Sequence, residues 1–209
     1  MDYIVVPLGF NEQTTLNAIK GLDKLVGVEI GRFRTSRVFA YIPLGDDVNK
    51  RAFGYFSDNL TFLDNRLDSI ESRIILSNRL SKCVKHAGSQ AAFDFLNDVR
   101  YAVEQLGAVV EDSMNYASIG FALEKKYNWN VKKAYDNLVH IAINRNFDLE
   151  SSVRFAGTAL IGKRKKEVAI RMIDEKLGDS DGNKDLKNNV FKAYEEVGQR
   201  LGQDTALSY

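Results

Sequence analysis

The sequence is poor in several residue types, and each shortage excludes a class of protein. Its 209 residues include 1 cysteine and 2 histidines, so the chain cannot form an internal disulfide or an all-cysteine metal cluster. The 2 prolines leave room for uninterrupted helices. No apolar run approaches the ~18 residues of a membrane span. The opening lacks the basic segment of a signal peptide, so we expect a cytoplasmic protein without a membrane partner.

The charge is balanced in total but uneven along the chain. There are 29 Lys and Arg against 28 Asp and Glu, a formal net charge of +1. Residues 89–124 sum to −5, with one basic and six acidic side chains, and residues 125–172 sum to +7, with eleven basic and four acidic side chains. These blocks either pair with each other or mark separate binding faces.

The first 46 residues predict a small α/β head. Apolar, β-forming runs at residues 2–7, 26–30 and 38–42 predict three strands. Leucine and isoleucine at spacings of three from Leu16 to Leu25 predict a short helix between the first two strands. Residues 31–37 link the second and third strands as the loop of a hairpin.

After residue 46 the apolar pattern becomes helical. Seven residues recur at alternating steps of three and four, which is a heptad pattern: Phe53, Phe56, Leu60, Leu63, Leu67, Ile70 and Ile74. Gly88 is a candidate C′ glycine, so we expect a long antiparallel helical hairpin with two arms of about 35–40 residues, roughly 50–60 Å each. Gly107 and Gly120 are candidate breaks in the second arm. The heptad residues should be buried within one chain or form a subunit interface.

The predicted fold class is therefore α+β and helix-dominated. A small N-terminal three-stranded β/α element precedes the long antiparallel helical hairpin and a C-terminal helical bundle. The expected division is a head at residues 1–46 and an α-helical body at residues 47–209, which can also form one continuous domain.

The predicted hairpin loop is the first candidate nucleic-acid-binding segment. It carries Arg32, Arg34 and Arg37 beside Phe39 and Tyr41. Guanidinium groups bind phosphates, and aromatic rings stack on bases. The alternative is a solvated hairpin whose aromatic side chains lie in the core.

A four-residue basic run is the second candidate: Lys163, Arg164, Lys165 and Lys166. Such a run wraps a helix in just over one turn, so it cannot all face the core. It suits a nucleic-acid backbone or an acidic partner. The alternative is a solvated face, or pairing with the acidic block.

Residues 179–186 are a weak calcium candidate. Oxygen-bearing side chains recur at alternate positions, as in the first part of an EF-hand loop: Asp179, Asp181, Asn183 and Asp185. Lys184 stands where that loop requires glycine, and Val190 where it requires glutamate. A polar connection between two helices is the alternative, and we expect no other cofactor.

The chain lacks the common nucleophile, phosphate-loop, zinc-protease and dinucleotide motifs. We therefore expect a non-enzymatic binding or assembly protein that uses basic segments on a polyanion, RNA or DNA. One alternative is a self-assembling structural subunit, cellular or viral, whose charge blocks pair between subunits, so that it forms a homo-oligomer or binds a protein partner. Another is an enzyme with an unrecognised carboxylate or metal site.

Overall fold

The computed structural model describes residues 3–9, 13–15, 17, 29–32, 38–44, 50–161, 166–178 and 182–201. For residues 29, 31–32, 50–56, 161, 166, 182–183 and 194–201 it describes the backbone alone. The chain divides into two compact units, Met1–Ala117 (unit 1) and Ser118–Tyr209 (unit 2). The division after residue 46 stays a prediction.

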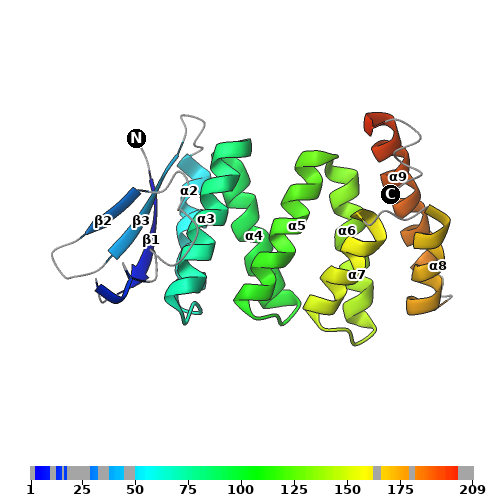
Figure 1. Ribbon diagram of the computed structural model, residues 1–209, viewed down its shortest axis with the longest axis horizontal. Helices are drawn as coiled ribbons and strands as arrows, with labels where there is room; N and C mark the ends of the chain where they lie inside the picture. The colour runs from blue at the N-terminus through cyan, green and yellow to red at the C-terminus, as the bar shows by residue number, and fades with distance from the viewer. Residues whose placement is uncertain are drawn as a thin grey trace. The chain divides into compact units, whose positions relative to one another are not determined.

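Helices dominate the described residues and follow a small sheet, so the predicted α+β class is confirmed (Figure 1). In chain order the elements are β1(Tyr3–Gly9), β2(Glu29–Arg32), β3(Val38–Pro43), α2(Lys50–Asp64), α3(Ile70–Ala87), α4(Ser89–Gln105), α5(Val110–Lys126), α6(Trp129–Asn144), α7(Leu149–Ile161), α8(Lys166–Leu177) and α9(Gly182–Leu201). No helix in these ranges is long and apolar enough to cross a membrane.

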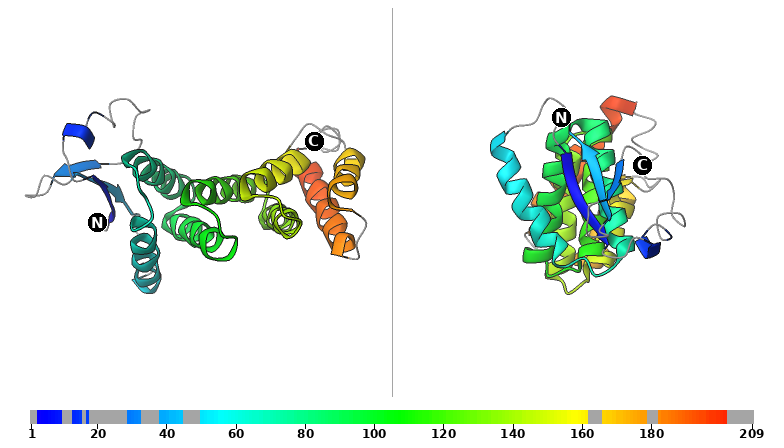
Figure 2. Two further views of the ribbon diagram at one scale, coloured as in Figure 1. Left: turned by 90° about the horizontal axis from the view of Figure 1, so that it is seen from below. Right: turned by 90° about the vertical axis from the view of Figure 1, so that its left-hand side faces the viewer.

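The sheet has three antiparallel strands in the order β1-β3-β2 (Figure 2). Side chains alternate between its faces, so paired residues of β1 and β3 share a face. Ile4 lies opposite Ile42, and Val6 lies opposite Ala40. All four are buried, and α3 packs against both strands, so this face and α3 build the core of unit 1.

The helical hairpin turns where the sequence predicted, but its arms are shorter. Gly88, with a φ of 83°, ends α3 and precedes α4, and the two helices pack against each other. The first arm is interrupted at residues 65–69, where Ser69 caps α3 by accepting a hydrogen bond from the backbone N–H of Ser72. The second is interrupted near Gly107, which has a φ of 66°, whereas Gly120 lies inside α5.

The heptad residues continue through the first interruption. Leu63, Leu67 and Ile74 are buried, although Leu67 lies in the turn between α2 and α3. Leu60 and Ile70 are half-buried. The side chains of Phe53 and Phe56 lie outside the described residues. The heptad spacing of apolar residues therefore continues across the break between α2 and α3, because the turn places Leu67 in the core.

Unit 2 contains the helical bundle predicted for the C-terminal part. Helix α6 packs against α7 and α9, and α8 contacts both of those helices. The bundle core includes one or two buried residues from each helix: Leu138, Val139, Ala156, Ile173, Leu186 and Val190. The exposed side chains of α6 are therefore on the face turned away from this core.

Candidate nucleic-acid interface

Most of the two predicted basic segments lies outside the described residues. Arg32 ends β2, where its backbone pairs with Val38 of β3, but its side chain is not described. Arg34 and Arg37 fall outside the described ranges, as do Lys163, Arg164 and Lys165. Lys166 begins α8, with only its backbone described. Binding by these residues stays a prediction.

The aromatic residues of the predicted hairpin lie on the outer face of the sheet. Val38, Ala40 and Ile42 fill the core, whereas Phe39 and Tyr41 alternate with them and are half-buried. The rings of Phe39 and Tyr41 have centroids 6.4 Å apart. Phe39 and Tyr41 therefore lie half-buried on the face of the sheet opposite to α3, whereas the loop at residues 33–37 lies outside the described residues.

The described part of the calcium candidate is helical. Asn183 and Asp185 belong to the first turn of α9, which begins at Gly182, and Asp185 is exposed. Asp179 and Asp181 lie outside the described residues. Within the described ranges, no group of three or more His, Cys, Asp or Glu side chains could hold a metal ion.

The turn between α5 and α6 presents an exposed aromatic ring that the sequence analysis did not single out. Tyr127, 1% exposed, anchors the turn in the core. Asn128 caps α6, its side chain accepting hydrogen bonds from the backbone N–H groups of Asn130 and Val131 at 2.8 and 3.1 Å. Trp129 is therefore held at the first position of α6, and it is 57% exposed.

Lysines flank Trp129 on both sides in the sequence, and two of them lie with it on α6. Residues 125–133 include four lysines and no acidic residue. Lys132 places its ammonium nitrogen 5.2 Å from the centroid of the Trp129 ring. Lys133 is exposed and lies four residues after Trp129, so both project from the same face of α6. We name these residues the Trp129 surface: Lys125, Lys126, Trp129, Lys132 and Lys133.

The electrostatics of the α6 N-terminus add to this positive charge. The first turn of α6 contains no acidic side chain. The partial positive charge of the helix end is therefore not offset by a carboxylate in that turn. Asp136 does pair with the buried Lys132, at 3.2 Å between the ammonium nitrogen and a carboxylate oxygen. Lys133 forms no ion pair within the described part of the chain.

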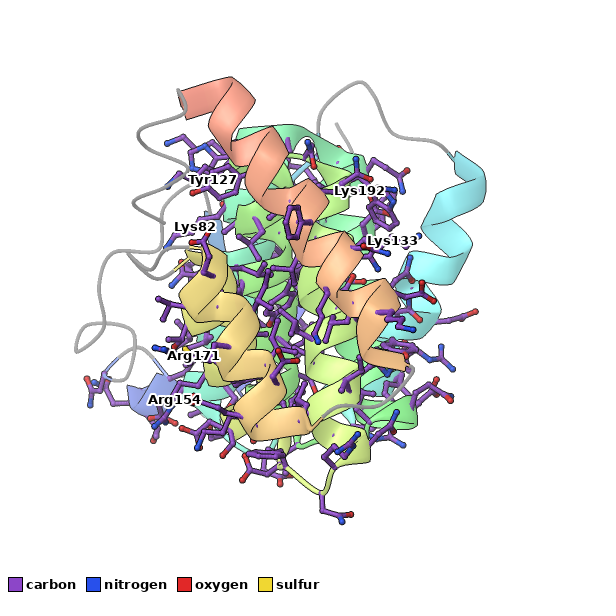
Figure 3. All side chains as sticks on the ribbon, turned by 90° about the vertical axis from the view of Figure 1, so that its right-hand side faces the viewer. Lys82, Tyr127, Lys133, Arg154, Arg171 and Lys192 are labelled. Carbon is purple, nitrogen blue, oxygen red and sulfur yellow. The ribbon has the colours of Figure 1, made fainter. Side chains whose placement is uncertain are left out.

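Other cations of the +7 block pair with carboxylates one turn away on their own helix. Arg154 pairs with Glu150 on α7, and Arg171 with Glu175 on α8. Figure 3 shows Arg154 and Arg171 on one edge of unit 2, and Lys133 and Lys192 on the opposite edge. The block is thus partly neutralised within single helices, and Lys133 lies away from the paired arginines.

A second cluster of cations and an aromatic ring lies in unit 1. The guanidinium carbons of Arg66 and Arg100 are 3.7 and 4.8 Å from the centroid of the Phe62 ring. Arg100 also donates to the side-chain oxygen of Asn59 at 2.9 Å and pairs with Glu104 at 3.0 Å. These contacts connect α2 with α4, so we interpret this cluster as structural.

Unit 1 also contains a cavity of about 380 Å³ beside the end of β1 and the turn after α2. Arg73 lines it, but its guanidinium donates to the backbone oxygens of Pro7, Asp64 and Leu67 at 2.9 to 3.1 Å, and to the Asp64 carboxylate. Burial lowers the pKa of Arg73 from its ordinary value. With its donors taken by the protein, Arg73 holds the fold together instead of binding a ligand.

Comparisons of the chain with protein families, curated proteins and solved structures find no match. The functional argument therefore depends on the surfaces described above. A signal for the Trp129 surface is visible in the sequence, because the single tryptophan stands midway between two lysine pairs, Lys125-Lys126 and Lys132-Lys133.

Proposed function

We propose that this protein is a non-enzymatic nucleic-acid-binding protein and that the Trp129 surface contacts the ligand. The observation that carries the proposal is the 57% exposure of Trp129 between three exposed lysines, Lys125, Lys126 and Lys133. Lysine side chains bind the phosphate backbone without regard to sequence. Aromatic rings beside such lysines add stacking to bases. This surface offers both kinds of contact.

A second copy of the chain is a less favourable occupant of this surface. A two-fold contact brings the same patch of each subunit together. Two Trp129 surfaces would then place three exposed lysines against three exposed lysines, and like charges across an interface oppose association. A polyanion supplies the complementary charge. The charge of the surface therefore favours nucleic acid over self-association.

The test compares two single-charge variants of the full chain. Binding to a labelled, mixed-sequence oligonucleotide at low salt is measured by fluorescence anisotropy. We expect Lys133→Gln to weaken binding about two- to fivefold, the value of one exposed ion pair. Arg171→Gln, which removes the same charge from the opposite edge of unit 2, should leave the affinity unchanged.

Both replaced side chains are exposed, so neither variant should change the far-UV circular dichroism spectrum. Equal weakening by the two variants would show that binding follows overall charge and not the Trp129 surface. Absence of binding by the unaltered protein would reject the proposed function itself.

A further inference from the structure

We infer that Trp129 stacks on unpaired bases, so that the ligand is single-stranded nucleic acid or a single-stranded stretch of a longer one. This inference rests on the proposed function, because stacking requires a nucleic acid at the Trp129 surface. In a duplex the bases are stacked on one another, and their faces are closed to side chains except at the ends. In a single strand each base offers a face to an aromatic ring.

The exposure of the indole carries the argument. The two faces of the ring make up most of its surface, and Lys132 lies against it, 5.2 Å from the centroid. An exposure of 57% therefore requires that a large part of a ring face is open. Phe62 differs, because it is half-buried and two guanidiniums lie against its ring. Trp129 is thus the better stacking platform.

The platform is also fixed in place before a ligand arrives. Tyr127 and Val131, two residues to either side of Trp129, are both 1% exposed, so the backbone is anchored. The Lys132 stem packs above Gly120 of α5, where an added Cβ would lie 3.4 Å from the Lys132 Cε atom. An ordered platform reduces the entropy lost when a base binds.

The lysines supply phosphate contacts along the chain of the ligand. Lys125 and Lys126 precede the ring in the last turn of α5, and the exposed Lys133 follows it on α6. Lys132 is buried and paired with Asp136, so it supports the ring and not a phosphate. A strand whose base stacks on Trp129 can therefore place phosphates near cations contributed by both helices. Contacts of this kind track the backbone and leave the bases free to stack.

The experiment uses the full chain and three probes: a mixed-sequence single-stranded oligonucleotide, its duplex, and inorganic polyphosphate, which has no bases. Trp129 is the single tryptophan, so its fluorescence reports on this surface. We expect the single strand to quench this fluorescence strongly, and polyphosphate to bind without comparable quenching. Trp129→Leu should weaken binding of the labelled single strand about 5- to 100-fold, the effect of losing one stacked base.

Trp129→Leu should leave binding of polyphosphate unchanged, and Trp129→Phe, which keeps a ring, should retain more affinity for the single strand. Unchanged circular dichroism shows that the variants are folded. If Trp129→Leu weakens all three probes equally, or none of them, the stacking inference is overturned while polyanion binding stands. If no probe binds the unaltered protein at low salt, the proposed function fails. Self-association that Trp129→Leu abolishes would overturn both, because the surface would then be a contact between copies.

Discussion

Arg73 connects three segments of unit 1 through a single side chain. The break between α2 and α3 leaves backbone carbonyl groups at the end of α2 without helical partners. The Arg73 guanidinium donates to two carbonyls of this region, those of Asp64 and Leu67, and to that of Pro7 in β1. Its side chain is 15% exposed, so water has little access to replace these bonds.

We predict that Arg73→Leu lowers the free energy of unfolding by about 2–4 kcal/mol, because it leaves several acceptors without donors. Arg73→Lys should recover only part of the loss, because an ammonium group lacks the fork geometry of the guanidinium. Urea unfolding followed by circular dichroism measures both. The matched control is Arg154→Leu, which removes an exposed pair and should cost no more than about 1 kcal/mol. Equal losses in the two leucine variants would contradict the structural role of Arg73.

Residues of the same chemical class have opposite environments in the α5–α6 turn, and this limits prediction from sequence. Tyr127 is 1% exposed and Trp129 is 57% exposed, although they are two residues apart. The end of α5 and the cap of α6 decide which ring enters the core, and those depend on tertiary packing. The charge of residues 125–133 was predictable, whereas the exposure of the ring between the lysines was not.

At the scale of elements, Asp148 makes the stability of the α7 N-terminus depend on pH. It precedes α7, and its carboxylate accepts hydrogen bonds from the backbone N–H and the hydroxyl of Ser151, at 2.7 and 3.0 Å. The bond from the Ser151 backbone is the main cause that lowers the pKa of Asp148 below its ordinary value of 3.8, and the Ser151 hydroxyl adds to it. The ionised carboxylate is therefore the form that caps the helix best.

Because the pKa of Asp148 is lowered in the folded chain, acid should reduce the stability of the fold. A carboxyl whose pKa is lower in the folded chain stabilises it at pH values above the unfolded pKa, and this contribution is lost as the pH falls through the folded pKa. Asp148→Asn should therefore lose less stability than the unaltered protein when the pH falls from neutral to below 3.8. Urea midpoints at the two pH values measure this. Ser151→Ala should give an intermediate result, and identical acid sensitivity in all three proteins would contradict the coupling.

The element boundaries that the sequence predicted are those with a local chemical signal. Gly88 and Gly107 adopt positive φ at helix ends. The break at residues 65–69 was missed because Leu67 keeps the apolar period while lying in the turn. Its stabilisation comes from Arg73, whose bond to β1 spans a long stretch of sequence. Contacts of that kind leave no periodic signal.

At the scale of the whole molecule, net charge and local charge give different expectations for binding. The chain carries +1 in total, yet residues 125–133 alone carry four lysines and no acidic residue. Only cations that contact phosphates release counterions when nucleic acid binds. The salt dependence of binding therefore measures the local surface, and the total charge of the chain does not enter.

We predict that the logarithm of the affinity for a single strand falls linearly with the logarithm of salt concentration, with a slope of about −2 if the three exposed lysines, Lys125, Lys126 and Lys133, contact phosphates. Lys133→Gln should reduce the magnitude of the slope by about 0.7, and Arg171→Gln should leave it unchanged. Titrations at several salt concentrations give both values. A slope of about −0.7 or weaker, the value for a single cation, would mean that at most one lysine contacts phosphate, and the Trp129 surface would then not be the binding face.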